Sequence, residues 1–323
     1  MNRVLRINME SNMKNLIINT LGKEFDLIKI NNDNNEGHGH VLSVKIVLPC
    51  YCQAKCPFCF NHETIDTQMH NYNEFEKNLI DSLDMLITTI KNRKITLDVT
   101  GNEPTFNVPQ FKRFIKALGS FKKRHSDVIE NIVLTTNGFN LNECLYEIGN
   151  NVDILNISLH HYDYSSRRNI FGTKYIPSNE DLKLICENLK MMGVKTTSVA
   201  VIYCMTDMNK FVKEFSLASK EMGFVDSRIR INYTSNNQLL RDLFYEKFEN
   251  EKVVEQSGLK TKYLDIDGYS TTIYLGVKDL VDHVIGVELV IDDNGKLYLD
   301  YNKRYQIDRN LLNSFNEHIY LIK

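Results

Sequence analysis

Three cysteines in one short segment are the side chains of this sequence best suited to chemistry. The segment at 49–64 reads PCYCQAKCPFCFNHET and places three residues between Cys52 and Cys56 and two between Cys56 and Cys59. The apolar, β-branched run VLSVKIVLP precedes it, so we expect the thiolates to converge on one loop after a strand. Three thiolates can hold a four-iron, four-sulfur cluster and leave one iron free for an external ligand.

A zinc site is the alternative use of these cysteines. Structural zinc usually takes four ligands in two separated pairs, and the chain has no second CxxC pair. Cys50 could complete a site in the same loop, but it lies two residues from Cys52 and we expect it to point elsewhere. The total of seven cysteines is odd, and nothing suggests export, so metal binding is favoured over disulfides. A non-catalytic zinc or redox-sensing protein therefore stays open as an alternative.

Polar residues follow the next predicted strands in the segments TGNEPT (100–105), LTTNGFN (134–140) and NISLHHYDYSSRRNIFG (156–172). The carboxyl ends of parallel strands meet at one edge of a sheet, where ligands bind. A carboxylate such as Glu103 can receive an ammonium group there. Ser158 and His160 alternate onto one side of a strand, so we expect both to face the interior.

The elements that must position these residues alternate between strand and helix. Strands are predicted at 41–49, 95–100, 131–136, 153–159, 195–204 and 227–233, and helices at 75–90, 108–121, 141–148, 179–192 and 210–222. Such alternation implies right-handed parallel βαβ units. Periodicity alone does not separate a barrel from an open doubly wound sheet. We interpret the fold class as α/β, a partial (β/α)6 TIM-like barrel with a small antiparallel C-terminal cap.

The division of the chain follows from the same pattern. We assign 1–40 to an N-terminal extension, 41–235 to the core, and 236–323 to a helical connection and a C-terminal β-hairpin cap. Within the last part a helix is predicted at 238–250, and Asn294-Gly295 between alternating apolar runs indicates a hairpin.

The cysteine spacing, with aromatic Phe58 before the third cysteine, resembles the CxxxCxφC signature of the radical S-adenosylmethionine (radical SAM) superfamily. TGNEPT is similar to its GGEP motif with Asn102 in place of the second glycine. The segment around 158 is similar to SLD, with His160 in place of the aspartate. The likeness covers about 41–233 and is nearest to single-cluster members related to the GTP cyclase of molybdenum cofactor synthesis and to peptide-modifying enzymes.

The resemblance implies two cofactors, a 4Fe-4S cluster and S-adenosyl-L-methionine. The implied cluster ligands are Cys52, Cys56 and Cys59. The implied contacts to S-adenosylmethionine are Phe58, Gly101, Asn102, Glu103, Thr136, Asn137, Ser158, His160 and Arg168. In this interpretation Ser158 binds a ribose hydroxyl and Arg168 pairs with the methionine carboxylate, although a solvated arginine is an equal alternative.

The implied activity is that of an enzyme that cleaves S-adenosylmethionine reductively and abstracts a hydrogen atom from a small-molecule or nucleotide substrate. A peptide substrate, as for an epimerase, is the alternative, and flavodoxin or ferredoxin is the implied electron donor. No cysteine follows Cys204, which disfavours auxiliary clusters. Cys204 could donate a hydrogen atom, but buried free cysteine is the commoner meaning, and more so for Cys144 and Cys186.

Two arginines and the overall charge complete the expectations. Arg228 and Arg230 share one face of a predicted strand and could bind a phosphate or carboxylate, unless that face points to solvent. The chain of 323 residues has a net charge of -2 and no uninterrupted apolar stretch of membrane-spanning length. Long nucleic acids and membranes are therefore poor partners, and we expect a cytoplasmic protein.

Overall fold

The computed structural model describes residues 41–59, 72–89, 94–202, 207–231, 248, 251–256, 259–276, 289–298 and 306–307. The predicted extension at 1–40, nearly all of the predicted helix at 238–250, and Cys204 lie outside these residues. No helix in the described part is long and apolar enough to cross a membrane.

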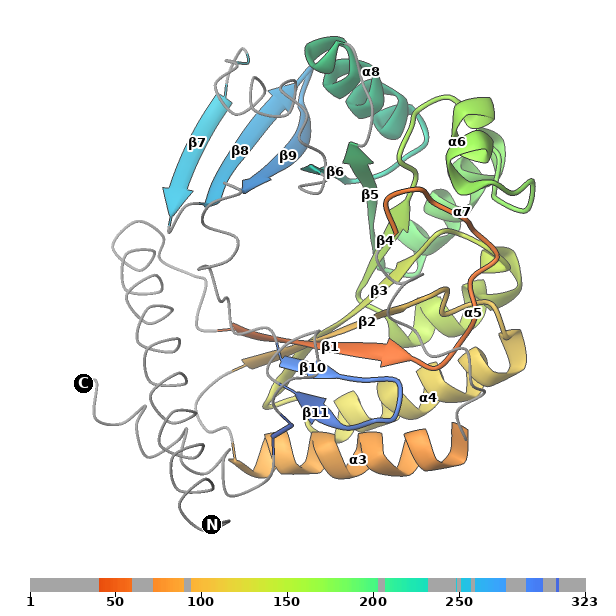
Figure 1. The fold of residues 1–323 in the computed structure, drawn as a ribbon, viewed down its shortest axis with the longest axis vertical. Coiled ribbons are helices and arrows are strands. Elements are labelled where there is room, and N and C mark those ends of the chain that lie inside the picture. The colour runs from red at the N-terminus through yellow and green to blue at the C-terminus, as the bar shows by residue number, and fades with distance from the viewer. Residues whose placement is uncertain are drawn as a thin grey trace, which may run out of the picture.

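Six parallel strands form the centre of one curved sheet, in the order in which they occur along the chain (Figure 1). They are β1 (Val41–Leu48), β2 (Lys94–Gly101), β3 (Ile129–Thr136), β4 (Ile154–Ser158), β5 (Lys195–Ile202) and β6 (Asp226–Ile231). Each pairs in parallel with the next. The predicted α/β fold with a partial barrel is confirmed.

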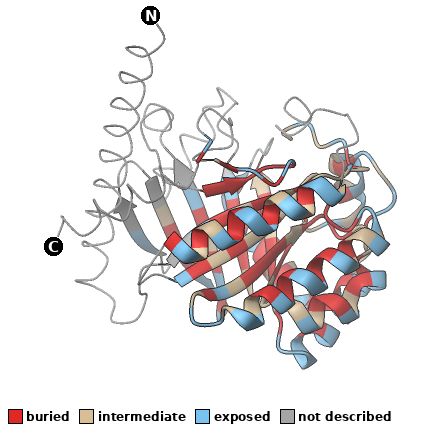
Figure 2. Cartoon of the chain, turned by 90° about the horizontal axis from the view of Figure 1, so that it is seen from below, coloured by how far each residue is buried: buried red, intermediate tan, exposed pale blue. Residues whose placement is uncertain are grey.

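Helices cover the outer side of the curved sheet (Figure 1). They are α3 (Tyr72–Thr89), α4 (Val108–Arg124), α5 (Leu141–Asn151), α6 (Tyr164–Phe171), α7 (Asn179–Met191) and α8 (Met208–Glu221). Figure 2 shows stripes of buried and exposed residues along them, the pattern of helices with one face on a sheet. Cys144 and Cys186 lie buried in the core between helices and sheet, as expected.

Helix α6 was missed by the sequence interpretation, because YSSRRNIF has little apolar periodicity. Its N-terminal signal is Asp163, whose carboxylate accepts a hydrogen bond from the backbone N–H of Ser166 at 2.7 Å. Gly172 ends the helix in the left-handed conformation, as is common at helix C-termini. These two cap residues could have predicted the helix.

The antiparallel strands of the C-terminal region extend the sheet at both of its edges. Strands β7 (Glu251–Gln256), β8 (Leu259–Ile266) and β9 (Tyr269–Gly276) form a meander whose β9 pairs in parallel with β6. Strands β10 (Leu289–Ile291) and β11 (Leu297–Tyr298) form the predicted hairpin, and β10 pairs in parallel with β1. The expected antiparallel C-terminal elements are thus present, and they cover the two open edges of the parallel core.

The turn of the β10–β11 hairpin is held against α3. Gly295 has a φ of 75°, and its backbone carbonyl accepts a hydrogen bond from the hydroxyl of Ser82 at 2.8 Å. A Cβ atom at Gly295 would lie 2.5 Å from the carbonyl oxygen of Phe75. Glycine is required here by both the backbone angle and the close approach.

The two faces of the sheet have different roles. Ser198 of β5 and Ser227 of β6 face α8, because the Ser198 hydroxyl donates to Ser219 at 2.9 Å and bonds to Ser227 at 2.7 Å. Successive side chains of a strand point to opposite faces. The residues next to them, Val199 and Arg228, therefore face the inner, concave side of the sheet.

Candidate active site

The cysteine loop follows β1 and is tied to α6. The backbone N–H of Lys55 donates to the carbonyl of Phe171, the last residue of α6, at 2.7 Å. Ala54 is buried in a small apolar cluster with Phe171 and Ile176, against which Cys52 and Cys56 pack. The loop is thus held in place on α6, the helix that follows β4.

The thiols of this loop lie within electrostatic reach of one another. Burial raises the pKa of Cys52 to about 11 and that of Cys56 to about 12, and the charges of Cys52 and Cys59 contribute to the increase at Cys56. In the metal-free chain these two thiols are protonated near neutral pH, so metal binding must release protons. Cys50 packs against the main core instead, in agreement with the expectation that it points elsewhere.

The three thiols of the loop can be compared with the ligand sets of a single ion and of a cluster. Within the described residues, no three His, Cys, Asp or Glu side chains are grouped closely enough to hold one metal ion. A tetrahedral zinc ion needs its ligands around one centre, whereas the thiolates of an iron–sulfur cluster bind different iron atoms. Three cysteines on one loop match the donor type of an iron–sulfur cluster, and their assignment as its ligands stays a prediction.

Glu103 is the centre of the hydrogen bonds at the ends of β2 and β3. Its buried carboxylate accepts bonds from the Thr105 N–H at 3.0 Å and the Thr105 hydroxyl at 2.7 Å. It also accepts bonds from the Thr136 hydroxyl at 2.6 Å and the Asn137 N–H at 2.7 Å. Burial raises the pKa of Glu103, and these four donors oppose that increase.

The Glu103 carboxylate uses its two oxygens unequally. Oε1 accepts the bonds from Thr105 and Thr136, whereas Oε2 accepts only the Asn137 N–H within the described residues, so the expected contact with an ammonium group stays a prediction. Asn102 stands where the family motif has its second glycine, and its φ is not positive. The Asn102 side chain donates to the carbonyl of Cys50 at 2.5 Å, because the two loops lie side by side.

Gly101 allows the close approach of these two loops. Its φ is 134°, and an added Cβ atom would lie 2.9 Å from the backbone nitrogen of Leu48, at the end of β1. A side chain at Gly101 would push the GNEP turn away from the start of the cysteine loop.

Asn137 connects the Glu103 cluster to the cysteine loop. Its side-chain N–H donates to the sulfur of Cys52 at 3.5 Å, and its side-chain oxygen accepts a bond from Gln53 at 3.0 Å. Hydrogen bonds to ligand sulfurs influence the reduction potential of iron–sulfur clusters. Thr105 and Gln53, which the sequence interpretation did not select, complete this network and carry no sequence signal of their own.

His160 lies against the cysteine loop, but not as a continuation of β4. The strand ends at Ser158, and His160 has a φ of 63°, so the predicted alternation stops before it. Its buried ring packs on Phe58, with centroids 4.8 Å apart, and on Phe171 at 5.0 Å. Its Nδ1 accepts the N–H of Val201 at 3.0 Å, and burial lowers its pKa to about 3, so the ring is neutral.

Ser158 and the two predicted arginines share the inner face of the sheet. Ser158 is in register with Val199, and Val199 with Arg228. One register step further along, Val201 of β5 pairs with Arg230. Arg228 and Arg230 therefore lie on the inner face of the sheet. The sequence pattern had not decided which face carries them.

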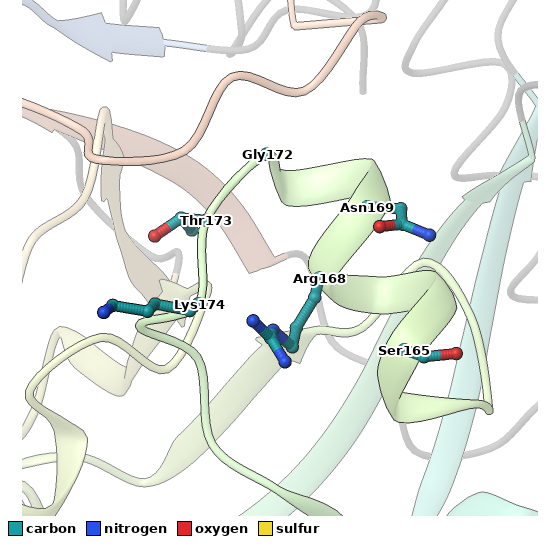
Figure 3. A pocket seen from close by; sticks show the side chains of 6 residues that line it. All are labelled: Ser165, Arg168, Asn169, Gly172, Thr173 and Lys174. Atoms are coloured by element: carbon teal, nitrogen blue, oxygen red, sulfur yellow. The ribbon is translucent and has the colours of Figure 1, made fainter.

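Arg168 lies on α6 and lines a polar hollow between this helix and the segment that follows it (Figure 3). The hollow has a volume of about 600 Å³ and is lined by Ser165, Arg168, Asn169, Gly172, Thr173 and Lys174. Arg168 is exposed, reaches toward the segment that carries Thr173 and Lys174, and stacks over Tyr164 at 5.8 Å. Its predicted contact with a methionine carboxylate stays a prediction.

The neighbouring Arg167 is a structural residue. Its side chain is 1% exposed and donates to the side-chain oxygen of Asn179 at 2.6 Å and to the carbonyl of Pro177 at 3.3 Å. Burial lowers its pKa to about 10, so it remains charged at neutral pH. Arg167 therefore connects α6 to the start of α7.

A partial parallel barrel with a three-cysteine loop after its first strand defines a class of cluster-dependent enzymes. The family model described as Radical SAM superfamily matches residues 46–218, more than half of the chain. The chain belongs to this superfamily and carries its enzyme domain, which implies an iron–sulfur cluster and S-adenosylmethionine as cofactors. No curated protein matches the sequence.

Several solved structures share the fold. Native anSMEcpe with bound AdoMet and Cp18Cys peptide has a TM-score of 0.56 at 15% identity, covering 87% of this chain and 80% of that one. A tagged form of anSMEcpe with bound AdoMet has a TM-score of 0.55 at 16% identity, covering 87% and 83%. SuiB from Streptococcus suis has a TM-score of 0.53 at 13% identity, covering 86% and 66%. This chain spans 40 to 66% of the SuiB chains, and these likenesses concern the fold.

Proposed function

We propose that Cys52, Cys56 and Cys59 hold a 4Fe-4S cluster and that the enzyme cleaves S-adenosylmethionine reductively to abstract a hydrogen atom from its substrate. The observation that carries the proposal is the three-cysteine loop after β1, held on α6 by the Lys55–Phe171 bond and bonded through Cys52 to Asn137 at the end of β3. When bound, the cluster supplies the electron that breaks the C5'–S bond and yields a 5'-deoxyadenosyl radical.

The chain's own residues position the reactants. Gly101 and Asn102 bring the GNEP turn against the cysteine loop, and the Glu103 cluster holds that turn to the end of β3. The backbone carbonyls of the turn and the Glu103 carboxylate, whose Oε2 accepts a single bond within the described residues, are the acceptors we assign to the methionine ammonium group. Ser158 at the end of β4 faces inward and can bind a ribose hydroxyl.

The neighbourhood of Phe58 excludes water from one side of the loop. Phe58, His160 and Phe171 pack ring against ring, and the neutral imidazole adds no charge there. A radical intermediate must meet one chosen C–H bond and little else, so such an apolar wall restricts side reactions.

We propose a small molecule or nucleotide as the substrate, and flavodoxin or ferredoxin as the electron donor. A peptide is the second candidate, because a structure with the same fold, anSMEcpe, is described with a bound peptide. In either case the substrate lies at the carboxyl ends of the strands, the edge at which the cysteine loop is placed.

Anaerobic reconstitution of the full chain tests this function. We expect the visible absorbance of an iron–sulfur cluster, and release of 5'-deoxyadenosine when the protein is reduced with S-adenosylmethionine present. Cys52→Ala should lose the cleavage and most of the cluster absorbance, whereas Cys50→Ala, altered in the same loop, should keep both. One tightly bound zinc ion and no cleavage in the wild-type chain would contradict the proposal.

A further inference from the structure

The inner face of β5, β6, β8 and β9 carries two groups of charged residues. We call the group near the start of β6, which contains Asp226, the lower layer, and the group nearer its end, Arg228 and Arg230, the upper layer. In the lower layer, near the start of β6, Asp226 is already neutralised by Lys195, with an N–O distance of 2.8 Å. The other described carboxylate on this wall, Asp265, accepts the N–H of Gly268 in the β8–β9 turn. Both carboxylates thus have a partner within the lower layer, although the buried Oδ1 of Asp226 accepts no hydrogen bond within the described residues.

The upper layer carries two guanidinium groups. Arg228 is in register with Thr272 of β9, and Thr272 with Tyr263 of β8. Arg230 is in register with Tyr274 and lies over its ring, 5.9 Å from the centroid. Within the described part of the chain, neither arginine has a carboxylate partner, since Asp226 is bound to Lys195.

This upper layer is open to solvent. Tyr263 and Tyr274 are 45% and 38% exposed, and Arg230 is exposed as well. Two guanidinium groups beside two accessible aromatic rings have the chemistry to bind an anionic group next to a planar or apolar one. A ligand that carries an anionic group and a planar or apolar group can therefore reach the upper layer.

The layer also lies near the cysteine loop. Ser158, Val199 and Arg228 form one row across three neighbouring strands, so the Cα atoms of Ser158 and Arg228 are about 10 Å apart at the usual strand spacing. In the next row, Val201 bonds to His160, which packs on Phe58, and is in register with Arg230. A ligand held by the arginines thus extends toward the end of β4 and the cluster loop.

We propose that Arg228 and Arg230 bind the anionic group, a carboxylate or a phosphate, of this enzyme's substrate, with Tyr263 and Tyr274 against the adjoining part of the molecule. This inference rests on the proposed function for the position of the reacting centre, but the anion site itself does not depend on cleavage activity.

Anion binding to the reconstituted, unreduced holoenzyme with S-adenosylmethionine present tests the site. Inorganic phosphate and acetate are titrated separately by calorimetry, and the tighter of the two identifies the anion class. Arg228→Gln or Arg230→Gln should raise the dissociation constant of that probe at least about tenfold, as expected for the loss of a charge-assisted hydrogen bond.

The matched control is Arg124→Gln, which removes a guanidinium that also stacks on an aromatic ring, 5.6 Å from Phe121, on a helix of the outer side. It should leave anion binding unchanged. The inference is wrong if the wild-type chain binds neither anion, or if the two inner variants bind as tightly as wild type.

Cleavage of S-adenosylmethionine without substrate separates this inference from the proposed function. Arg228→Gln and Arg230→Gln should keep the wild-type yield of 5'-deoxyadenosine and the same cluster absorbance. Loss of that cleavage would assign the arginines to the cofactor and overturn the inference. A wild-type chain that binds phosphate or acetate but cleaves nothing would instead contradict the proposed function alone.

Discussion

Two regions of the candidate site, the ends of β2 and β3 and the inner face of β6, differ in how many of their polar groups have hydrogen-bond partners within the chain. At the ends of β2 and β3, the Glu103 carboxylate has four donors within the chain, and Asn137 is bonded to the cysteine loop. On β6, Arg228 and Arg230 face the interior without a carboxylate partner among the described residues. We infer that the first half is pre-organised for a constant cofactor and that the second is left for a ligand to complete.

The strongest test of this contrast is Glu103→Ala. The change leaves the buried hydroxyl of Thr136 and the N–H groups of Thr105 and Asn137 without an acceptor, so we expect the free energy of unfolding to fall by about 3 kcal/mol or more. Urea unfolding of the metal-free chain measures it. Glu130→Ala, at an exposed position of β3, should change the value by less than about 0.5 kcal/mol. Equal effects of the two variants would show that the Glu103 cluster is not a structural centre.

A second test concerns the bond between Asn137 and Cys52. Asn137→Ala removes a donor to a proposed ligand sulfur, so the reduction potential of the cluster should become more negative. A donor of fixed potential then keeps less of the cluster reduced, and cleavage limited by that reduction should be about tenfold slower. Redox titration and the rate of 5'-deoxyadenosine release measure the two effects. Asn150→Ala, an exposed amide on α5, is the control. An unchanged potential would mean that this bond does not reach the cluster.

The buried ring of His160 predicts a pH dependence of stability. Its pKa is about 3 in the folded chain and about 6.5 when unfolded, so the unfolded state binds more protons between these values. Stability is fully present above about pH 6.5 and falls as the pH decreases toward 3, by up to about 1.4 kcal/mol per pH unit from this residue. His160→Asn, which tolerates the left-handed backbone, should flatten the slope between about pH 6 and 4.5 in urea unfolding of the metal-free chain. The same slope in both proteins would place His160 in contact with solvent.

The smallest effect is expected from the lower layer of the inner wall. Lys195→Ala releases the Asp226 carboxylate, which can then pair with Arg228 on the same strand face. We expect anion binding to weaken about two- to threefold, measured by the same titrations. Lys220→Ala, whose amino group donates to the carbonyl of Asp267 in the β8–β9 turn, should not change it. Unchanged binding in Lys195→Ala would show that the two layers are independent.

Much of the fold was predictable because the parallel core repeats one local pattern. Five of the six helices in the described part of the chain, and the six strands of the parallel core, follow from apolar periodicity and turn residues. Helix α6 escaped that reasoning because its signal lies in its caps, Asp163 and Gly172. The positions of β7–β9 and β10–β11 were not predictable, since which edge a strand joins is decided by long-range pairing.

The candidate site divides in the same way. Cysteine spacing and the motifs after β2, β3 and β4 identified the residues around the loop, because strand ends of a parallel sheet meet at one edge. The contacts that these site residues make depend on burial, which the motifs do not reveal. The Glu103 side chain bonds within the chain, and His160 turns into the left-handed region to pack on Phe58.

The sequence by itself determined the superfamily, the three proposed cluster ligands and the alternation of strands and helices, all of which depend on neighbours a few residues apart. Only the tertiary structure decided which polar side chains form hydrogen bonds within the chain and which face the concave side of the sheet. That distinction depends on strand register and on which face the helices cover, and both are set by contacts between residues far apart in the chain.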